Sequence, residues 1–378
     1  MSLPPPTLIA DASSLAVLVT TLAAQPVVAV DTESNSLHAY RERVCLIQFS
    51  TSDADYIVDP IALRDLTPLA TLFANPKQQK IFHAAEYDIV TMRRDFGFSF
   101  VNLFDTMSAA RTLGWPQVGL AAILETQFGV KMDKKHQRSD WKRRPLTQEQ
   151  LDYARLDTHY LPALRDKQIE ALTATGSLAE AMEEFERLAR LGENPDPRPD
   201  PALAFWRVKG ARELTPPQAA ILQALYVFRE QQADRQDRPP FKVMAEPTLL
   251  EIARRAPRSV AALPGIPGMT PEQIRRYGQG LLQAVSQGLQ APPQYWPHVE
   301  QEPDEILERY DRLSAWRKTR ARARGVESDV ILPKTVLWAL ARNPARTRED
   351  LAAISDLGPW RRELYGDELL KLLQEGRG

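Results

Sequence analysis

The feature that most constrains the fold is an internal repeat, in which two stretches of the C-terminal half match each other at a spacing of 88 residues. The matched pairs, with no gap between them, include Phe228-Arg229 with Trp316-Arg317, Tyr277-Gly278 with Tyr365-Gly366, and Leu281-Leu282 with Leu369-Leu370. Repeats that stack into one continuous solenoid have periods of roughly 20–50 residues. The longer period predicts two tandem helical domains instead.

Two proline-rich stretches divide the chain. Residues 194–201 alternate proline with polar residues, which is typical of an extended linker, and residues 291–297 form a second break. The expected organisation, from the N-terminus, is a catalytic domain over 1–193, a proline-rich linker and lead-in over 194–211, a helical domain over 212–290, a linker over 291–304, and a second helical domain over 305–378.

The first domain mixes strand and helix signals. Short apolar runs, which are typical of buried strands, occupy residues 27–30, 44–49, 56–58 and 80–83. Helical patterns occupy residues 85–96 and 147–170, and Thr147 with Gln150 has the spacing of a capping box. Strands followed by intermixed strands and helices predict an α/β domain with a mixed sheet.

Composition excludes several classes of protein. The formal net charge is -1, from 48 Lys and Arg against 49 Asp and Glu, so nucleic-acid binding would have to come from local clusters of charge. Cys45 is the sole cysteine and lies in an apolar run, which predicts a core residue and excludes an internal disulfide or a cysteine-based zinc site. The pattern predicts no signal peptide and no membrane span, and a reducing cytoplasm fits.

Three groups of residues that contain acidic side chains are candidates for a catalytic site. Asp31 and Glu33 follow the first apolar run, and because alternate residues of a strand share a face, their carboxylates should project together. Asp88 stands in the first turn of a predicted helix, and Tyr153 and Asp157 share a face of a later one. Each pattern alone is also typical of a solvated strand end, a helix N-terminus or a half-exposed helix. Their common order is what indicates a site.

In that order and spacing, the residues resemble the four-acid 3′–5′ exonucleases, in their tyrosine-bearing branch, and most closely the ribonuclease D family. The characteristic text around them is Val30-Asp-Thr-Glu33, Val44-Cys-Leu-Ile-Gln48, Ser139-Asp-Trp141, Arg143-Arg-Pro-Leu146 and Tyr153-Ala-Arg-Leu-Asp157. The resemblance covers roughly residues 20–170, while both repeats resemble the helical accessory domain shared with RecQ-type helicases, the second one more loosely.

This resemblance implies an RNase H-like catalytic fold and a hydrolase that removes nucleotides from RNA 3′ ends, with tRNA precursors as the leading substrate. It also implies two divalent cations, Mg²⁺ or Mn²⁺, and no organic cofactor. Two such cations about 3.5–4 Å apart can stabilise charge on the attacking and leaving oxygens of a phosphodiester. By the resemblance, Asp31, Glu33 and Asp157 would hold one ion, Asp31 would bridge to a second near Asp88, and Tyr153 would orient the attacking water.

Local charge fits a polyanionic substrate. Residues 131–144 contain seven Lys or Arg against two Asp, and residues 316–324 contain five bases and no acid. His83, which precedes Asp88 by five residues, is a candidate substrate contact. Further candidates are Lys134, Lys135, Arg138, Arg143, Arg317 and Arg320, with Trp141 as a stacking surface. Either basic run could also be a solvated face, Trp141 could be buried, and His83 could be a structural histidine.

Two alternative functions remain open. The first is a DNA exonuclease of repair or proofreading type, although Ala84 stands where proofreading enzymes usually carry asparagine. A helicase is excluded, because the sequence contains no phosphate-binding loop of the G-x-x-x-x-G-K-[ST] type. The second alternative, a catalytically inactive RNA-binding protein, is disfavoured by the presence of all four acids and the tyrosine.

The helical repeats are expected to bind RNA and not to take part in the reaction. The linker at 194–201 should make them separable from the catalytic domain.

Overall fold

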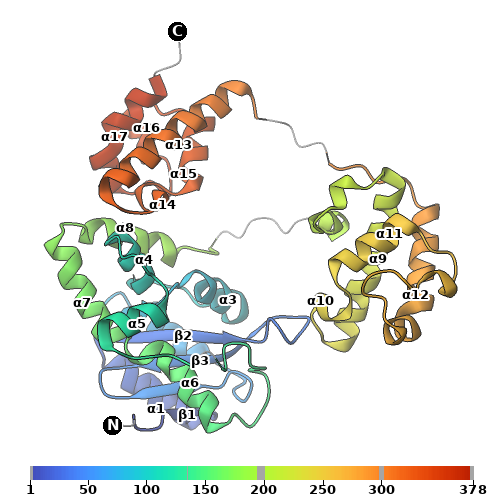
Figure 1. The fold of residues 1–378 in the computed structure, drawn as a ribbon. Helices are drawn as coiled ribbons and strands as arrows, with labels where there is room; N and C mark the ends of the chain where they lie inside the picture. Colours follow the sequence, from blue (N-terminus) through green and yellow to red (C-terminus); the bar gives the residue numbers. More distant parts are fainter. Residues whose placement is uncertain (1–2, 134, 194–200, 298–301, 375–378) are drawn as a thin grey trace. The chain divides into compact units, whose positions relative to one another are not determined.

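The computed structural model describes residues 3–133, 135–193, 201–297 and 302–374. The chain forms two compact units, whose elements are drawn in Figure 1. One unit comprises residues 1–34, 44–194 and 301–378, and the other comprises residues 35–43 and 195–300. None of the helices within the described ranges is both long and apolar enough to cross a membrane.

The first unit contains a six-stranded mixed sheet with the strand order β1-β4-β3-β2-β5-β6. Strand β3 runs antiparallel to β2 and β4, and the other neighbours run parallel. The strands are β1 Thr7–Ile9, β2 Val27–Ser34, β3 Val44–Ser50, β4 Asp55–Val58, β5 Gln79–Phe82 and β6 Leu103–Asp105. The predicted α/β fold with a mixed sheet is confirmed, and all four predicted apolar runs fall on strands.

Helices surround this sheet in the exonuclease part of the unit (Figure 1). They are α1 Ala12–Ala23, α2 Ala70–Phe73, α3 Glu86–Phe96, α4 Thr106–Thr112, α5 Leu120–Phe128, α6 Gln148–His159, α7 Leu161–Ala174 and α8 Leu178–Ala189, with a short 3₁₀ turn, η1, at Thr67–Leu69. The helical pattern over 147–170 forms two helices, because Pro162 cannot continue the hydrogen-bond ladder of α6. The capping box of Thr147 and Gln150 starts α6 as predicted.

Both faces of the central strand β3 are covered. On one face the ring of Phe49 lies 6.1 Å from that of Phe73 in α2. On the other face the Ser50 hydroxyl is 2.7 Å from the Thr158 hydroxyl of α6. Cys45 is fully buried in a small apolar cluster that also contains Trp141, which confirms it as a core residue. The packing of α6 on β3 brings that helix close to β2, the strand that carries the first acids.

Two helical domains form the rest of the described chain. The first consists of α9 Pro216–Gln236, α10 Pro240–Val243, α11 Glu246–Arg255 and α12 Pro271–Gln290, with 3₁₀ turns η2 Pro201–Arg207, η3 Ala211–Glu213 and η4 Val260–Ala262. The second consists of α13 Asp304–Arg324, α14 Ser328–Ile331, α15 Lys334–Arg342, α16 Arg348–Ala352 and α17 Pro359–Gln374. Shifted by the 88 residues of the repeat, α9 and α10 have the same bounds as α13 and α14.

The lead-in to the first helical domain contributes to that domain's core. Phe205, Val208 and Ala211 are buried there together with α9 and α12 side chains. The domain boundaries drawn from the sequence stay a prediction.

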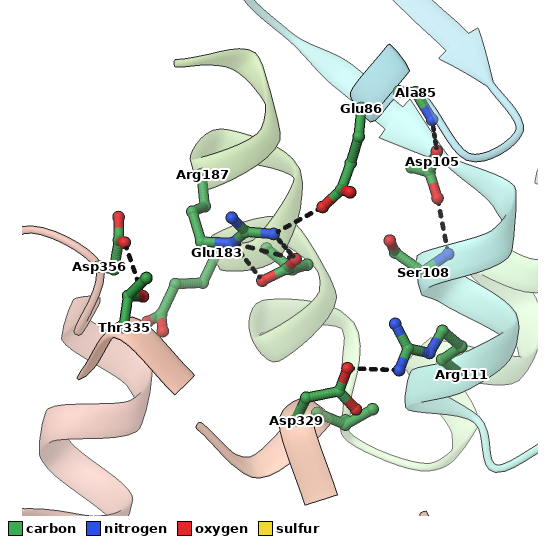
Figure 2. Close-up of polar contacts among 12 residues, drawn as sticks. Ala85, Glu86, Asp105, Ser108, Arg111, Glu183, Arg187, Asp329, Thr335 and Asp356 are labelled. Carbon is green, nitrogen blue, oxygen red and sulfur yellow. Dashed lines mark hydrogen bonds and ion pairs between the residues drawn. The ribbon is translucent and has the colours of Figure 1, made fainter. Parts of the chain in front are cut away.

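The second helical domain packs on the exonuclease domain within the same compact unit. Glu180 of α8 is fully buried and accepts hydrogen bonds of 2.7 and 2.6 Å from the guanidinium of Arg324. Arg111 of α4 and Asp329 of α14 form a further ion pair of 2.5 Å (Figure 2). The second repeat thus contacts the exonuclease domain, and the expectation that the repeats are separable at the linker stays a prediction.

Candidate active site

Strand β2 presents two carboxylates on one face of the sheet. Asp31 is paired with Gln48 of β3, and Glu33 is paired with Leu46. Because directly opposite residues of an antiparallel pair point to the same side, these four side chains share the face that α6 covers. Helix α6 brings Tyr153 and Asp157 to that region, and α3 contributes Asp88 from its first turn.

Burial and electrostatic repulsion raise the pKa values of the four carboxylates. Burial raises the pKa of Asp31 well above its usual value, and repulsion from Asp88, Asp157 and Glu33 adds to this effect. Burial followed by repulsion from Asp157 and Asp88 raises the pKa of Glu33. Burial raises the pKa of Asp88 to about 7, and burial with repulsion from Asp88 raises the pKa of Asp157 to about 7. The four predicted acids thus lie in one region of the fold, and their roles as metal ligands stay a prediction.

This donor set fits a divalent cation. Carboxylate oxygens are the ligands that Mg²⁺ and Mn²⁺ prefer, and a cation would relieve the repulsion between buried acids. Within the described residues, no group of three or more His, Cys, Asp or Glu side chains is close enough together to hold a metal ion as the side chains stand. Mg²⁺ usually keeps several waters and needs only one or two carboxylates, so an open arrangement of acids suits it.

Thr32 ties Asp88 to the strand that carries the other acids. Its hydroxyl donates a hydrogen bond to the Asp88 carboxylate, and the Asp88 side chain is almost completely buried. No sequence pattern indicates this role, because a threonine inside a strand is ordinary. The contact fixes α3 against β2 at the site.

Tyr153 is held by aromatic packing on α6. The ring of Trp141 stacks on it with centroids 6.0 Å apart, and the His136 ring meets it edge-on at 5.9 Å. Trp141 is only 1% exposed, so the prediction that it offers a stacking surface to nucleic acid is wrong, and it supports Tyr153 instead. Burial, then the charges of Asp157 and the other acids, raise the pKa of Tyr153. The phenol therefore stays protonated at neutral pH.

The opposite side of α6 is anchored to β4. Asp55 lies 2.9 Å from Nδ1 of His159 and accepts a hydrogen bond of 2.6 Å from the Ser50 hydroxyl. Arg155 lies 3.9 Å from the same carboxylate. These buried contacts fix the rotation of α6, and with it the direction in which Tyr153 and Asp157 point.

Comparisons with known proteins show which family the chain resembles over its whole length. A family model described as 3′-5′ exonuclease matches residues 6–172, and the HRDC domain model matches residues 218–285 and 306–373. Ribonuclease D of Pseudomonas paraeruginosa is 30% identical over 370 residues, which cover 97% of this chain and 97% of the relative. Ribonuclease D of Gluconacetobacter diazotrophicus is 32% identical over 379 residues, which cover 99% of this chain and 94% of the relative.

The chain belongs to the ribonuclease D family. The crystal structure of Escherichia coli RNase D, described as an exoribonuclease involved in structured RNA processing, matches with a TM-score of 0.71 and 26% identity, and covers 99% of this chain and 100% of that one. The protein is thus a hydrolase, a 3′–5′ exoribonuclease, with HRDC domains at its C-terminal side. The 3′–5′ exonuclease family depends on divalent metal ions.

In this ribonuclease D family member, the connection from β5 to α3 is held by Asp105 of β6. The Asp105 carboxylate accepts hydrogen bonds of 2.7 Å from the backbone N–H groups of Ala85 and Ser108 (Figure 2). Ala84 adopts a left-handed backbone with φ of 63° just before this anchor. Sequence reasoning missed Asp105, because its role depends on a contact between distant segments.

His83 lies at the same connection and is neutral. Its Nδ1 is 2.9 Å from the Thr106 hydroxyl, and burial lowers the pKa of the imidazole to about 4. A contact of His83 with substrate would therefore be a neutral hydrogen bond and not an ion pair. The substrate-binding role predicted for it stays a prediction.

The basic segment before α6 divides into structural and exposed residues. Arg144 binds the Asp59 carboxylate through two hydrogen bonds of 2.5 and 2.7 Å, so it fixes the segment. Lys135, Arg138 and Arg143 are exposed, and Lys134 lies outside the described residues. The exposed side chains of Lys135, Arg138 and Arg143 are accessible to a polyanion in solution.

Several basic side chains of α13 already bind partners within the protein, so fewer of them are available to bind phosphate than the sequence implies. Arg320 makes a hydrogen bond of 2.9 Å to Glu368, and Arg317 donates to the Leu332 carbonyl at 2.9 Å. Arg324 is engaged by Glu180 of the exonuclease domain. A phosphate contact by Arg317 or Arg320 stays a prediction, and it would compete with these intramolecular partners.

Proposed function

We propose that this enzyme trims tRNA precursors from their 3′ ends, in the cytoplasm, with two divalent cations, Mg²⁺ or Mn²⁺. The observation that carries the proposal is the group of four buried carboxylates from β2, α3 and α6, with a protonated tyrosine beside them. E. coli RNase D, described as acting in structured RNA processing, supports the substrate class.

Each acid has a proposed role. Asp31, Glu33 and Asp157 would hold one ion, and Asp31 would bridge to a second near Asp88. Bound cations supply charge stabilisation for the attacking and leaving oxygens of the phosphodiester. The buried setting strengthens this effect, because charges interact more strongly where water is excluded. No nucleophile from the protein is required.

Tyr153 is proposed to position the water that attacks the terminal phosphodiester. Its raised pKa keeps a hydroxyl that can donate and accept hydrogen bonds, and the Trp141 ring limits its movement. Neutral His83 would contact the terminal nucleotide from the β5–α3 connection.

Binding of the RNA backbone is assigned to the basic segment before α6, of which Lys135, Arg138 and Arg143 are exposed. Lys134, Lys135, Arg138 and Arg143 precede α6, the helix that carries Tyr153 and Asp157, and phosphate contacts of this kind position RNA without reading its sequence. The helical domains, proposed to span 212–290 and 305–378, would add further contacts, including those of Arg317 and Arg320.

A comparison of substrates tests the proposal. Purified protein is incubated with 5′-labelled tRNA precursor carrying a 3′ extension, with unstructured RNA and with DNA of the same sequence, in Mg²⁺, Mn²⁺ or EDTA. We expect stepwise shortening of RNA from the 3′ end, dependent on metal, fastest on the precursor extension and absent in Asp31→Asn. Equal or faster shortening of DNA would favour the DNA exonuclease, and equal rates on both RNAs would contradict the tRNA assignment.

A further inference from the structure

Gln48 of β3 is a buried polar residue with no structural partner. Its side chain is fully buried, and within the described chain neither the amide nitrogen nor the amide oxygen has a hydrogen-bond partner. Burying an amide without hydrogen bonds costs free energy, so such groups are rare and require a reason. An apolar side chain at this position would pack at lower cost.

The register of the sheet places Gln48 beside the first metal-ligand candidate. It is directly opposite Asp31, and Cβ atoms of such cross-strand neighbours lie about 4.5–5.5 Å apart. The next residue on the same face, Ser50, contacts Thr158 of α6. Gln48 therefore lies under α6, between the acidic site and the anchor of that helix.

A second buried glutamine of the same domain, Gln78, has the hydrogen bonds expected of an amide with a structural role. Gln78 is 1% exposed, and its amide nitrogen donates hydrogen bonds of 2.5 and 2.7 Å to the carbonyls of Leu22 and Gln25. The Gln78 amide thus satisfies carbonyl groups at the C-terminal end of α1, whereas the Gln48 amide satisfies no other polar group. The difference points to a task for Gln48 in the site itself.

We infer that Gln48 is a positioning residue for the metal-bound state, in which its amide N–H group, without a partner in this structure, would donate to the Asp31 carboxylate and orient it as a ligand. The inference rests on the metal site of the proposed function. Partners of this kind orient the ligands of a metal, and their removal costs roughly 10–100-fold in metal affinity or activity. A neutral amide suits the task, because a Lys or Arg beside Asp31 would compete with the cation for the carboxylates.

The test compares Gln48→Met with the matched control Gln78→Met in the full-length protein. Manganese binding is measured by calorimetric titration, and thermal unfolding is measured in EDTA. We expect Gln48→Met to weaken Mn²⁺ binding roughly 10–100-fold while the unfolding temperature stays level or rises, because an unpaired buried amide has been removed. Gln78→Met should lower the unfolding temperature and leave Mn²⁺ affinity unchanged.

Gln48→Leu serves as the second variant if Gln48→Met does not fold. Wild-type Mn²⁺ affinity in either folded variant would overturn the inference, and so would a fall in unfolding temperature equal to that of Gln78→Met. A wild-type protein that binds no Mn²⁺ would instead overturn the proposed metal site, so the two failures are distinguishable.

Discussion

The carboxylate of Glu183 in α8 lies 2.7 Å from the guanidinium of Arg361 in α17, and the two side chains are only 8% and 2% exposed. Glu183 also accepts a hydrogen bond of 2.8 Å from the backbone N–H of Trp360, at the positive end of the α17 dipole. Gly358 permits this approach, since a Cβ added there would lie 2.0 Å from the Glu183 carboxyl carbon. One exonuclease-domain acid thus caps a helix of the second helical domain.

Arg361→Met should strongly destabilise the full-length protein, because it leaves the Glu183 carboxylate buried without its partner. Removing one member of a buried ion pair costs about 3–5 kcal/mol. The matched control is Arg348→Met in the same domain, whose side chain is 48% exposed and whose ion pairs should contribute at most about 1 kcal/mol. Thermal unfolding measures both. Equal shifts for the two variants would show that the buried pair does not hold the domains together.

Asp157→Asn should abolish hydrolysis while the protein remains folded. The change keeps the size of the side chain and removes a proposed ligand charge, and a loss of about 4 kcal/mol of transition-state stabilisation corresponds to roughly a thousandfold. Asp152→Asn is the control on the same helix, since Asp152 is half-exposed and pairs with Arg155. Single-turnover rates on RNA check both variants, and near-wild-type turnover in Asp157→Asn would refute the assignment.

Tyr153→Phe should lower turnover with little effect on metal binding, because the hydroxyl is proposed to position water and is not a ligand. Stacking on Trp141 is kept by the phenylalanine ring, so the fold should be unaffected. Calorimetric titration with Mn²⁺ and single-turnover rates separate the two effects. If Mn²⁺ binding falls together with turnover, the hydroxyl supports the ligands instead.

Stability without metal should fall as pH rises from about 4 to above 7. Asp88 and Asp157 have pKa values of about 7 in the fold, against an ordinary value of 3.8, because both are buried and Asp88 repels Asp157. The folded state therefore binds more protons than the unfolded state across this window, and the free energy of unfolding decreases as pH rises. Unfolding temperatures in EDTA at pH 5 and pH 8 measure this slope. Asp157→Asn should flatten it, and an unchanged slope would contradict the electrostatic account.

Replacing Lys135 and Arg143 by glutamine should weaken RNA binding and its dependence on salt. For a single strand, each cation that no longer meets a phosphate lowers the slope of log affinity against log salt by about 0.7. The measurement uses an Asp31→Asn background, so that the RNA survives the titration. An equal double replacement of Lys77 and Arg64, which are exposed elsewhere in the domain, is the control. Identical slopes for the two double variants would remove the segment before α6 from the RNA interface.

Much of the exonuclease site was predictable from the sequence, because local patterns encode it. Alternation along a strand put Asp31 and Glu33 on one face, and the Thr147 capping box placed the start of the helix that carries Tyr153 and Asp157. The repeat at 88 residues predicted both helical domains, since the first two helices of each copy have the same bounds after that shift.

The rest depends on contacts between distant segments, which periodicity does not report. Trp141 was predicted as a stacking surface because it stands among basic residues, yet it is buried behind Tyr153. Arg324 belonged to a basic run, yet a buried carboxylate of α8 binds it. In both cases the residues next to the side chain in the sequence do not indicate which distant residue it contacts, Tyr153 for Trp141 and Glu180 for Arg324.

The burial of Cys45 has a practical consequence. It is the sole cysteine, and its side chain is fully buried in the cluster beneath α6. Thiol reagents react with accessible thiolates, so the native protein should offer them almost no background. Cysteines introduced at exposed positions, such as Val17 in α1 and Val227 in α9, would then be the reactive sites for a pair of fluorophores. The natural chain is therefore ready for distance measurements between its exonuclease domain and its first helical domain while RNA is bound.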